Sequence, residues 1–335
     1  MRQARALAAA TVVACLASVA AEAQTIKLGS LAPAGSPWEQ SLRKLASEWS
    51  RLSGGRVNLA VYPGGVVGDE DDMLRKVRIG QLSAAALSGP GLVSIVPAAV
   101  TLQIPQLVSS DGELDYLMEK MTPVFERRFE EKGFKLLSWT RAGWAYIFAR
   151  DPVIWPEDLR RQKLWVWQGS PEEARAWRDL GFQPVSLGSA DVMVQLQSGG
   201  IDAFITSPLI VASNQYFAFA NDMTELKWAP FVGGLVVSLK VWDSIAADLR
   251  SRLERAVVEV TESYRHDFLG ADAEAIGVMK RHGLVTHEVA PEAREAWRQF
   301  VKRGVGVFFG NQSDLQYYET ASRYLEEHRR ADQGR

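Results

Sequence analysis

The chain has 335 residues, of which 47% are hydrophobic and 23% charged, the composition of a globular protein large enough for two domains. Its formal net charge of -2 gives no electrostatic reason to expect nucleic acid or an anionic membrane surface as a partner. Recognition by this protein must therefore come from a local site.

The first 23 residues have the pattern of an export signal. MRQAR is a basic n-region, ALAAATVVACLASVA is a run of small apolar residues, and Ala21 to Ala23 form an A-x-A cleavage site before Gln24. Cleavage there removes Cys15, the only cysteine, and with it any disulfide or cysteine-based site. The alternative is a lipoprotein that begins at Cys15. The export signal predicts a mature protein outside the cytoplasm, and since no later segment approaches the roughly 18 apolar residues of a membrane span, we expect it to be soluble there.

The first unit of the mature chain is a strand, TIKLGSL, followed by a helix. Ser36, Pro37 and Glu39 match an N-cap, a first-turn proline and a capping box. Apolar residues then recur every three or four positions from Trp38 onward, which predicts an amphipathic helix that ends at Gly54.

Strand-like and helix-like segments go on alternating, which indicates parallel βα units. RVNLAVY and LSAAAL are predicted strands, and residues 135–150 are predicted as two strands broken at Arg141 to Gly143. A second set follows, in which KLWVW, QPVSL and IDAFI each precede a helix, and GLVVSLKVW is a further strand. Residues 244 to about 282 predict one long helix that bridges two lobes, and a helical region follows toward the C-terminus.

No set of residues points to catalysis, a cofactor or a bound metal. The four histidines lack metal-ligand spacing, and there is no G-x-S-x-G motif. The acidic cluster at residues 69–72 fits a first helical turn better than a cation site. SGPGLVS departs from the dinucleotide fingerprint, so we assign Gly89 to a turn that brings the backbone close to a ligand.

The strand KLWVW places Trp165 and Trp167 on the same side, because successive side chains of a strand alternate between its faces. A helix start follows at once, with Ser170 as N-cap, Pro171 in the first turn and Glu173 as the capping-box acid. Ligands of open α/β sheets bind at such junctions, where strands end. We therefore expect indoles at a ligand site.

Six segments occur in a set order over residues 24 to 310: LGSLAPAGSPW, VYPGG, GDEDDML, PEDLRRQKLWV, LQSGGIDAF and VWDSI. In this order they resemble the solute-binding proteins of TRAP transporters, the family that includes the dicarboxylate binders. The resemblance implies an α/β fold, a two-lobed periplasmic-binding-protein clamp in which each lobe is a βα sheet flanked by helices. Hinge strands and the long helix would join the lobes, and the protein would work in the periplasm without enzymatic activity.

The resemblance also implies lobe boundaries and partners. Lobe I would comprise residues 24–149 and about 236–280, and lobe II residues 150–235 and about 281–330. The expected partners are a small-molecule ligand and the small and large membrane subunits of a TRAP transporter. A helical-repeat lipoprotein is a further candidate, and no cofactor is implied.

The chain departs from the family pattern where that pattern has polar ligand contacts. The arginine that holds the substrate carboxylate in the family corresponds here to Trp165, and residues 202–208 are more apolar than their counterparts. An indole offers an apolar face and one N–H donor, whereas burying an unpaired carboxylate costs several kcal/mol. We therefore predict a hydrophobic or amphipathic ligand.

In this prediction aromatic side chains form the walls of the site, and Arg141, Gln168 and Thr206 supply polar contacts. The predicted ligand-binding residues are Trp38, Gly89, Arg141, Trp144, Trp165, Trp167, Gln168, Phe204, Thr206, Pro208, Trp228 and Phe231. The main alternative is an organic acid held by Arg141, and a periplasmic ligand-sensing domain is another.

Overall fold

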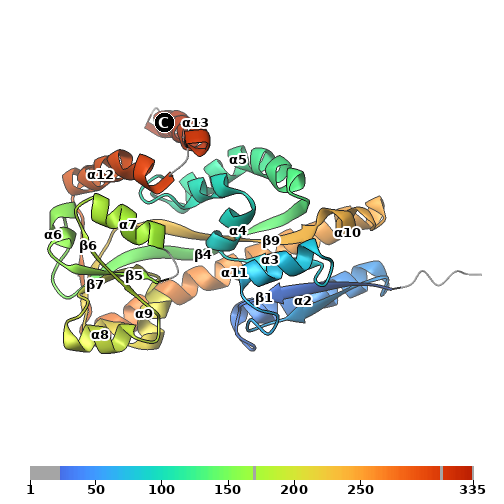
Figure 1. Ribbon diagram of the computed structural model, residues 1–335, viewed down its shortest axis with the longest axis horizontal. Coiled ribbons are helices and arrows are strands. Elements are labelled where there is room, and N and C mark those ends of the chain that lie inside the picture. Colours follow the sequence, from blue (N-terminus) through green and yellow to red (C-terminus); the bar gives the residue numbers. More distant parts are fainter. Residues whose placement is uncertain (1–22, 169–170, 310–311, 334–335) are drawn as a thin grey trace, which may run out of the picture.

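The computed structural model describes residues 23–168, 171–309 and 312–333. It is a mixed α/β structure with two lobes, as the resemblance implied (Figure 1). The strands follow the order β2-β1-β3-β9-β4-β7-β5-β6, so that β4 and β9 lie between the two lobes. The export signal and Cys15 lie outside the described residues. Within the described residues, no helix combines the length and apolar character needed to cross a membrane.

Lobe I is built on three parallel strands whose neighbouring helices cover both faces. Ser36 caps the first helix by accepting the N–H of Glu39 at 3.3 Å, and Gly54 ends it with a φ of 62°, so that helix is confirmed. The elements of lobe I are β1 (Gln24–Ser30), α2 (Pro37–Ser53), β2 (Val57–Tyr62), α3 (Glu70–Arg78), β3 (Ala84–Leu87), α4 (Gly89–Ile95), the 3-10 helix η1 (Pro97–Gln103) and α5 (Asp111–Glu131).

Strand β4 (Phe134–Ala149) connects the two lobes. It is one continuous strand, not the two that we predicted, but its pairing with β9 (Ala229–Ser238) is irregular between Arg141 and Trp144. The break predicted at this point is therefore a β-bulge, which bends a strand without ending it. The segment LKVW, predicted to continue β9, forms helix α10 (Leu239–Asp243) instead.

Lobe II repeats the βα pattern on the other edge of β4. Its predicted strands are present, whereas β8 and β10 have three residues each and gave no periodic signal. The predicted N-cap Ser170 lies outside the described residues. The elements are α6 (Pro156–Arg160), β5 (Lys163–Trp167), α7 (Pro171–Asp179), β6 (Gln183–Leu187), α8 (Val192–Ser198), β7 (Ala203–Thr206), α9 (Pro208–Asn214), η2 (Tyr216–Ala218), β8 (Asp222–Thr224) and β10 (Val285–His287).

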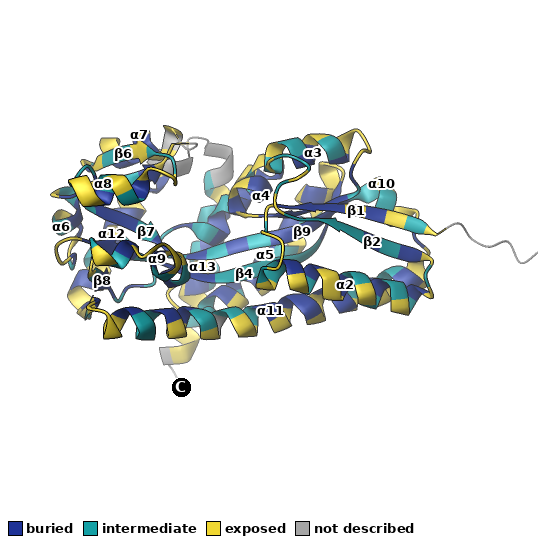
Figure 2. Cartoon of the chain, turned by 90° about the horizontal axis from the view of Figure 1, so that it is seen from below, coloured by how far each residue is buried: buried dark blue, intermediate teal, exposed yellow. Residues whose placement is uncertain are grey.

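Helix α11 (Ala247–Arg281) is the predicted long helix, and it packs on α2 and β4 as well as on α9 of lobe II (Figure 2). Helix α12 (Pro291–Phe309) covers lobe II, where it packs on α7. Helix α13 (Gln312–Gln333) packs on α5, and Arg329 of α13 pairs with Glu113 of α5 at 2.7 Å. These contacts put α13 on lobe I, whereas we expected residues up to about 330 in lobe II.

Candidate ligand site

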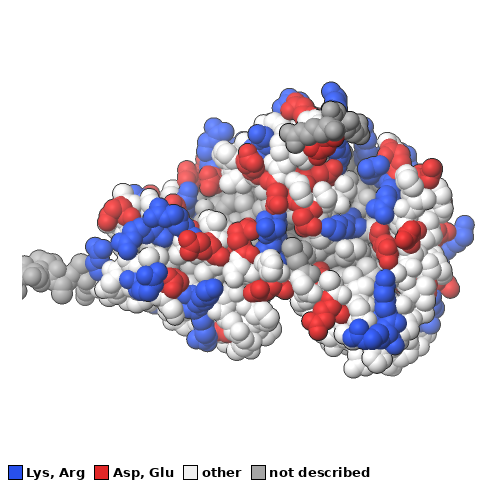
Figure 3. Space-filling model, turned by 180° about the vertical axis from the view of Figure 1, so that it is seen from behind, with Lys and Arg blue, Asp and Glu red and all other residues white. Residues whose placement is uncertain are grey.

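The parallel strands of both lobes end next to the same stretch of β4. In lobe I, Leu87 at the end of β3 pairs with Gly234 of β9, which pairs with Trp139 of β4. In lobe II, Thr206 at the end of β7 pairs with Tyr146 of β4. The molecular surface is indented between the lobes (Figure 3). Because ligands of such sheets bind beyond the carboxyl ends of strands, this is the candidate ligand site.

Large apolar side chains are exposed at these strand ends. Leu31 follows β1 and Val66 follows β2 in lobe I, and their side chains are 46% and 72% exposed. In lobe II, Trp167 ends β5 and is 54% exposed, Val194 lies at the start of α8 after β6, and Ile210 lies in the first turn of α9 after β7. Exposed apolar side chains at the strand ends of both lobes indicate a binding surface.

Strand β5 presents both of its indoles on one face, as predicted. Leu164 and Val166 are buried toward the core on the opposite face, and the exposed fraction alternates along the strand. Trp165 is half-buried, and its Nε1–H donates to the carbonyl of Leu187 at 3.1 Å. Trp167 has most of its ring free. The outer indole is therefore available for a ligand, while the inner one mainly supports it.

Three polar or turn-forming predicted residues lie at the same end of lobe II. Gln168 follows β5 and is exposed, with its N–H donating to the carbonyl of Leu187 at 3.1 Å. Thr206 ends β7, and Pro208 opens α9 behind the N-cap Ser207. The fold thus brings together Trp167, Gln168, Thr206 and Pro208.

In lobe I the two predicted residues have different surroundings. Trp38 is half-buried in the first turn of α2, and its ring lies 4.7 Å from that of Tyr264 on α11, centroid to centroid. Gly89 is buried, and a Cβ there would overlap the side-chain amide of Gln103. A side chain at position 89 would therefore meet Gln103 of the same chain, so no ligand is needed to explain the glycine at this position.

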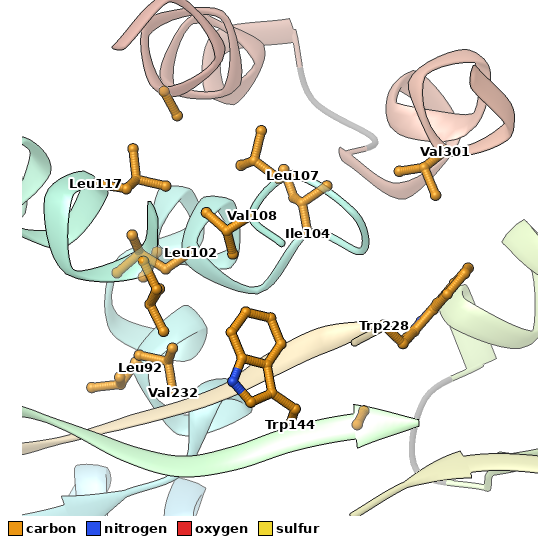
Figure 4. Packing of buried hydrophobic residues seen from close by; sticks show 14 of the residues in the cluster. Leu92, Leu102, Ile104, Leu107, Val108, Leu117, Trp144, Trp228, Val232 and Val301 are labelled. Carbon is orange, nitrogen blue, oxygen red and sulfur yellow. The ribbon is translucent and has the colours of Figure 1, made fainter. Parts of the chain in front are cut away.

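Three predicted wall residues lie in the hydrophobic core instead. Trp144, Phe204 and Trp228 are 2%, 0% and 4% exposed. Figure 4 shows Trp144 and Trp228 among aliphatic side chains of the core, and Phe204 stacks on Phe148 at 5.7 Å. Central strands are covered on both faces, so apolar character alone did not distinguish core from site at these positions. Phe231 is half-buried against the same core.

Arg141 does not offer a free cation to a ligand. Its guanidinium lies between Asp115 of α5, with which it forms a close ion pair, and Glu262 of α11 at 3.3 Å. The side chain of Arg141 is 13% exposed, and both carboxylates are about half exposed. Its charge is therefore already compensated by two carboxylates of the chain.

Carboxylates also accept hydrogen bonds from backbone amides near the strand ends, which we did not predict. In lobe I, Glu70 accepts the N–H of Ser88, just after β3, at 2.6 Å and the Ser88 hydroxyl at 2.8 Å. In lobe II, Asp272 of α11 accepts the N–H of Leu209, in the first turn of α9, at 3.3 Å. Glu70 belongs to the acidic cluster that we assigned to a first helical turn. That assignment is correct for Asp69, which caps α3 by accepting the N–H of Asp72.

These contacts set the electrostatics of the site. Backbone N–H groups at strand ends and helix starts are common anion donors, and here two of them already bind negative charge. Among the described residues, no group of histidine, cysteine, aspartate and glutamate side chains is arranged to hold a metal ion. The arrangement offers apolar surface and acidic neighbours, which disfavours an anionic ligand.

A separate cavity of about 360 Å³ lies where the loop before α5 meets the segment after β8 and helix α12. Its lining includes Tyr146, Ile276 and Lys227. Lys227 pairs with Asp111 at 2.8 Å, and Arg294, also in the lining, donates to the carbonyl of Val289. These cations are thus engaged within the protein, and we do not place the ligand there.

A family model described as DctP, bacterial extracellular solute-binding protein, family 7, matches residues 28–310. The chain belongs to this family. Members of family 7 are periplasmic binding proteins without enzymatic activity, and the family implies TRAP membrane subunits as partners. The family expected from the sequence is therefore confirmed.

Individual relatives of this family 7 protein are distant but match over most of their length. A solute-binding protein of Roseobacter denitrificans is 26% identical over 87% of this chain and 90% of its own. The C4-dicarboxylate-binding periplasmic protein DctP of Rhodobacter capsulatus is 24% identical, over 88% and 90%.

Solved structures show the same fold. A TRAP periplasmic solute-binding protein from Ochrobactrum anthropi superposes with a TM-score of 0.82 at 23% identity, over 92% of this chain and 97% of that one. The Roseobacter denitrificans structure, with bound L-galactonate, has a TM-score of 0.72 at 21% identity, over 90% of this chain and 99% of its own.

Proposed function

We propose that this TRAP solute-binding protein captures a hydrophobic or amphipathic small molecule between its lobes and delivers it to the membrane subunits. The observation that carries the proposal is the set of large apolar side chains exposed where the strands of both lobes end, with Trp167 the largest. Transfer of apolar surface out of water stabilises a complex by about 25 cal/mol per Å², so closure over these side chains would favour an apolar ligand.

The charges near the site support the same ligand class. The Roseobacter denitrificans relative holds L-galactonate, an acid, and such a ligand needs a cation or free amide donors. We take Trp165 to occupy the position of the family arginine, and Arg141 is paired with two carboxylates while the Ser88 amide is bound by Glu70. An acid would therefore enter next to negative charge, where the Arg141 guanidinium and the Ser88 amide are already engaged, at a cost of several kcal/mol.

The test is extraction of the protein with organic solvent after purification from its native host, followed by mass spectrometry. We expect an apolar or amphipathic compound that raises the melting temperature when it is added back. Trp167→Ala should weaken this effect, while Trp155→Ala, which removes an indole that is 43% exposed at the start of α6, should not. Recovery of small dicarboxylates or sugar acids alone would overturn the proposal, especially if Arg141→Ala abolished their effect.

We also propose that export ends with cleavage between Ala23 and Gln24. Strand β1 begins at Gln24, so cleavage there leaves the first strand whole. The intact mass of the exported protein distinguishes this start from one at a lipidated Cys15.

For an apolar cargo we propose a helical-repeat lipoprotein as a further partner, since such a molecule needs a protein carrier in water. Co-purification from the native host with the tagged binding protein tests this partner. Recovery of the membrane subunits without the lipoprotein would contradict it.

A further inference from the structure

Asp272 is a buried acidic residue where helix α11 passes the hinge. It is 8% exposed, and its Oδ1 accepts the N–H of Leu209 in the first turn of α9, at 3.3 Å. The backbone N–H of Trp144, on the hinge strand β4, also stabilises the ionised carboxylate. One side chain thus contacts a helix of lobe II and the strand that joins the lobes.

The bulge of β4 is fitted around this carboxylate. Gly143 has a φ of 77°, and a Cβ there would overlap Oδ2 of Asp272 and approach the ring of Phe268 to 3.1 Å. Just beyond this bulge the pairing partner of β4 changes, from β9 up to Ala145 to β7 from Tyr146 onward. Asp272 is therefore placed where a change in the angle between the lobes must be accommodated.

Among the described residues, the amides of Leu209 and Trp144 are the contacts that stabilise the ionised form of Asp272, and no cation is among them. The ionisable groups that respond to its charge are the phenols of Tyr146 on β4 and Tyr264 on α11. Helix α9, with the sequence PLIVASN, carries no ionisable side chain. Burial raises the pKa of Asp272 to about 6, although the two amides lower it.

We propose that Asp272 is a proton-sensitive positioning residue, which holds the first turn of α9 and the β4 bulge on α11 when ionised and releases one of them when protonated. An ionised carboxylate can accept from both amides, whereas protonation turns one carboxyl oxygen into a hydroxyl donor. The proton comes from the solvent. The inference rests on the proposed function only in that α9 carries Ile210 of the candidate site.

Hydrogen exchange of the Leu209 and Trp144 amides in the ligand-free mature protein tests this inference. Protection is first corrected for the intrinsic pH dependence of exchange. As the pH drops from 8 to 5, the protection of at least one of the two amides should then fall by about tenfold, because a factor of this size corresponds to the loss of one hydrogen bond. In Asp272→Asn the pH dependence should disappear. Asp267→Asn is the matched control, because Asp267 lies on the same helix with its side chain 74% exposed, and it should keep the wild-type profile.

Unchanged protection of both amides in the wild type, or a pH-dependent fall that persists in Asp272→Asn, would overturn the inference. If Asp272→Asn does not fold, carboxyl ¹³C titration of the wild type decides instead. A midpoint near 6 supports the inference, and one below about 4.5 contradicts it. Neither experiment uses a ligand, so this inference can fail without affecting the proposed ligand class. Likewise, the proposed ligand class can fail without affecting this inference.

Discussion

Both lobes satisfy a backbone amide at a strand end with a carboxylate, but they take that carboxylate from different places. In lobe I, Glu70 belongs to α3 of the same lobe and is half-buried. In lobe II, Asp272 belongs to α11, which also packs on lobe I through α2. The contact in lobe I is therefore unaffected by the angle between the lobes, whereas the contact in lobe II depends on it.

This difference separates two roles that charge plays in the molecule. Glu70 is accessible to water and only fills a local donor site. Asp272 is 8% exposed, and no cation among the described residues stabilises its charge, so its ionisation is costly and sensitive to small changes around it. Four substitutions test this difference.

The largest effect is expected for Asp272→Asn, in the pH dependence of stability. The folded protein raises the pKa of Asp272 from 3.8 to about 6, so protonation stabilises the fold below about pH 4 and that stabilisation is lost as the pH rises through 6. As the pH rises from 4 to 8, the wild type should lose about 3 kcal/mol of unfolding free energy through this group, and the variant should not show this loss. Urea unfolding at both pH values measures this, and equal pH dependence of the two proteins would contradict it.

Next in size is the effect of Trp167→Ala on ligand affinity. Loss of the exposed indole removes contact surface worth about 2 kcal/mol, which weakens binding of the extracted compound by at least about tenfold. The stability of the ligand-free protein should change little, since the ring is more than half exposed. Titration of the delipidated protein, with Trp155→Ala as control, gives the comparison. Equal affinities of the two variants would exclude Trp167 from the site.

For Glu70→Gln we expect a loss of about 1 kcal/mol in unfolding free energy, because the two charge-assisted hydrogen bonds from Ser88 are weakened. Protection of the Leu209 amide should be unchanged in this variant, since Glu70 belongs to α3 of lobe I whereas Leu209 belongs to α9 of lobe II. A change at Leu209 would show that the two strand-end contacts are coupled. Glu119→Gln, at a side chain that is 75% exposed, is the control.

Arg141→Ala should have the smallest effect. The substitution leaves Asp115 and Glu262 without their cation, but both are about half exposed and can be hydrated, so the loss of stability should stay below about 1 kcal/mol. Binding of the extracted compound should be unaffected. A large loss of affinity in isothermal titration would instead favour the organic-acid alternative.

The sequence predicted the arrangement of the fold well where the local signals were strong. Helix α2 starts at the predicted cap and ends at the predicted glycine, and the long helix falls within the predicted range. The hinge strand was divided in error because a bulge and a chain break give the same local signal, Gly143 in a strand. The two three-residue strands were missed because they are too short for a period.

The candidate site was predicted less completely. Trp167 and Gln168 could be placed because they end a recognisable strand, but the aromatic residues Trp144, Phe204 and Trp228 belong to the core. Composition cannot tell which face of a doubly covered strand meets a cleft. Asp272 did leave a signal, since it follows Tyr264 and Phe268 at intervals of four on a helix face where an acid is unexpected.

Helix α11 has 35 residues, a single rod about 52 Å long that lies along both lobes. Two lobes that pack on one helix cannot rotate as freely as two lobes joined by a flexible linker. Either the rod must bend between its two attachments, or one lobe must slide along it. The stiffness of this helix therefore favours one angle between the lobes in the ligand-free protein. A ligand that changes this angle must provide enough binding free energy to bend the helix.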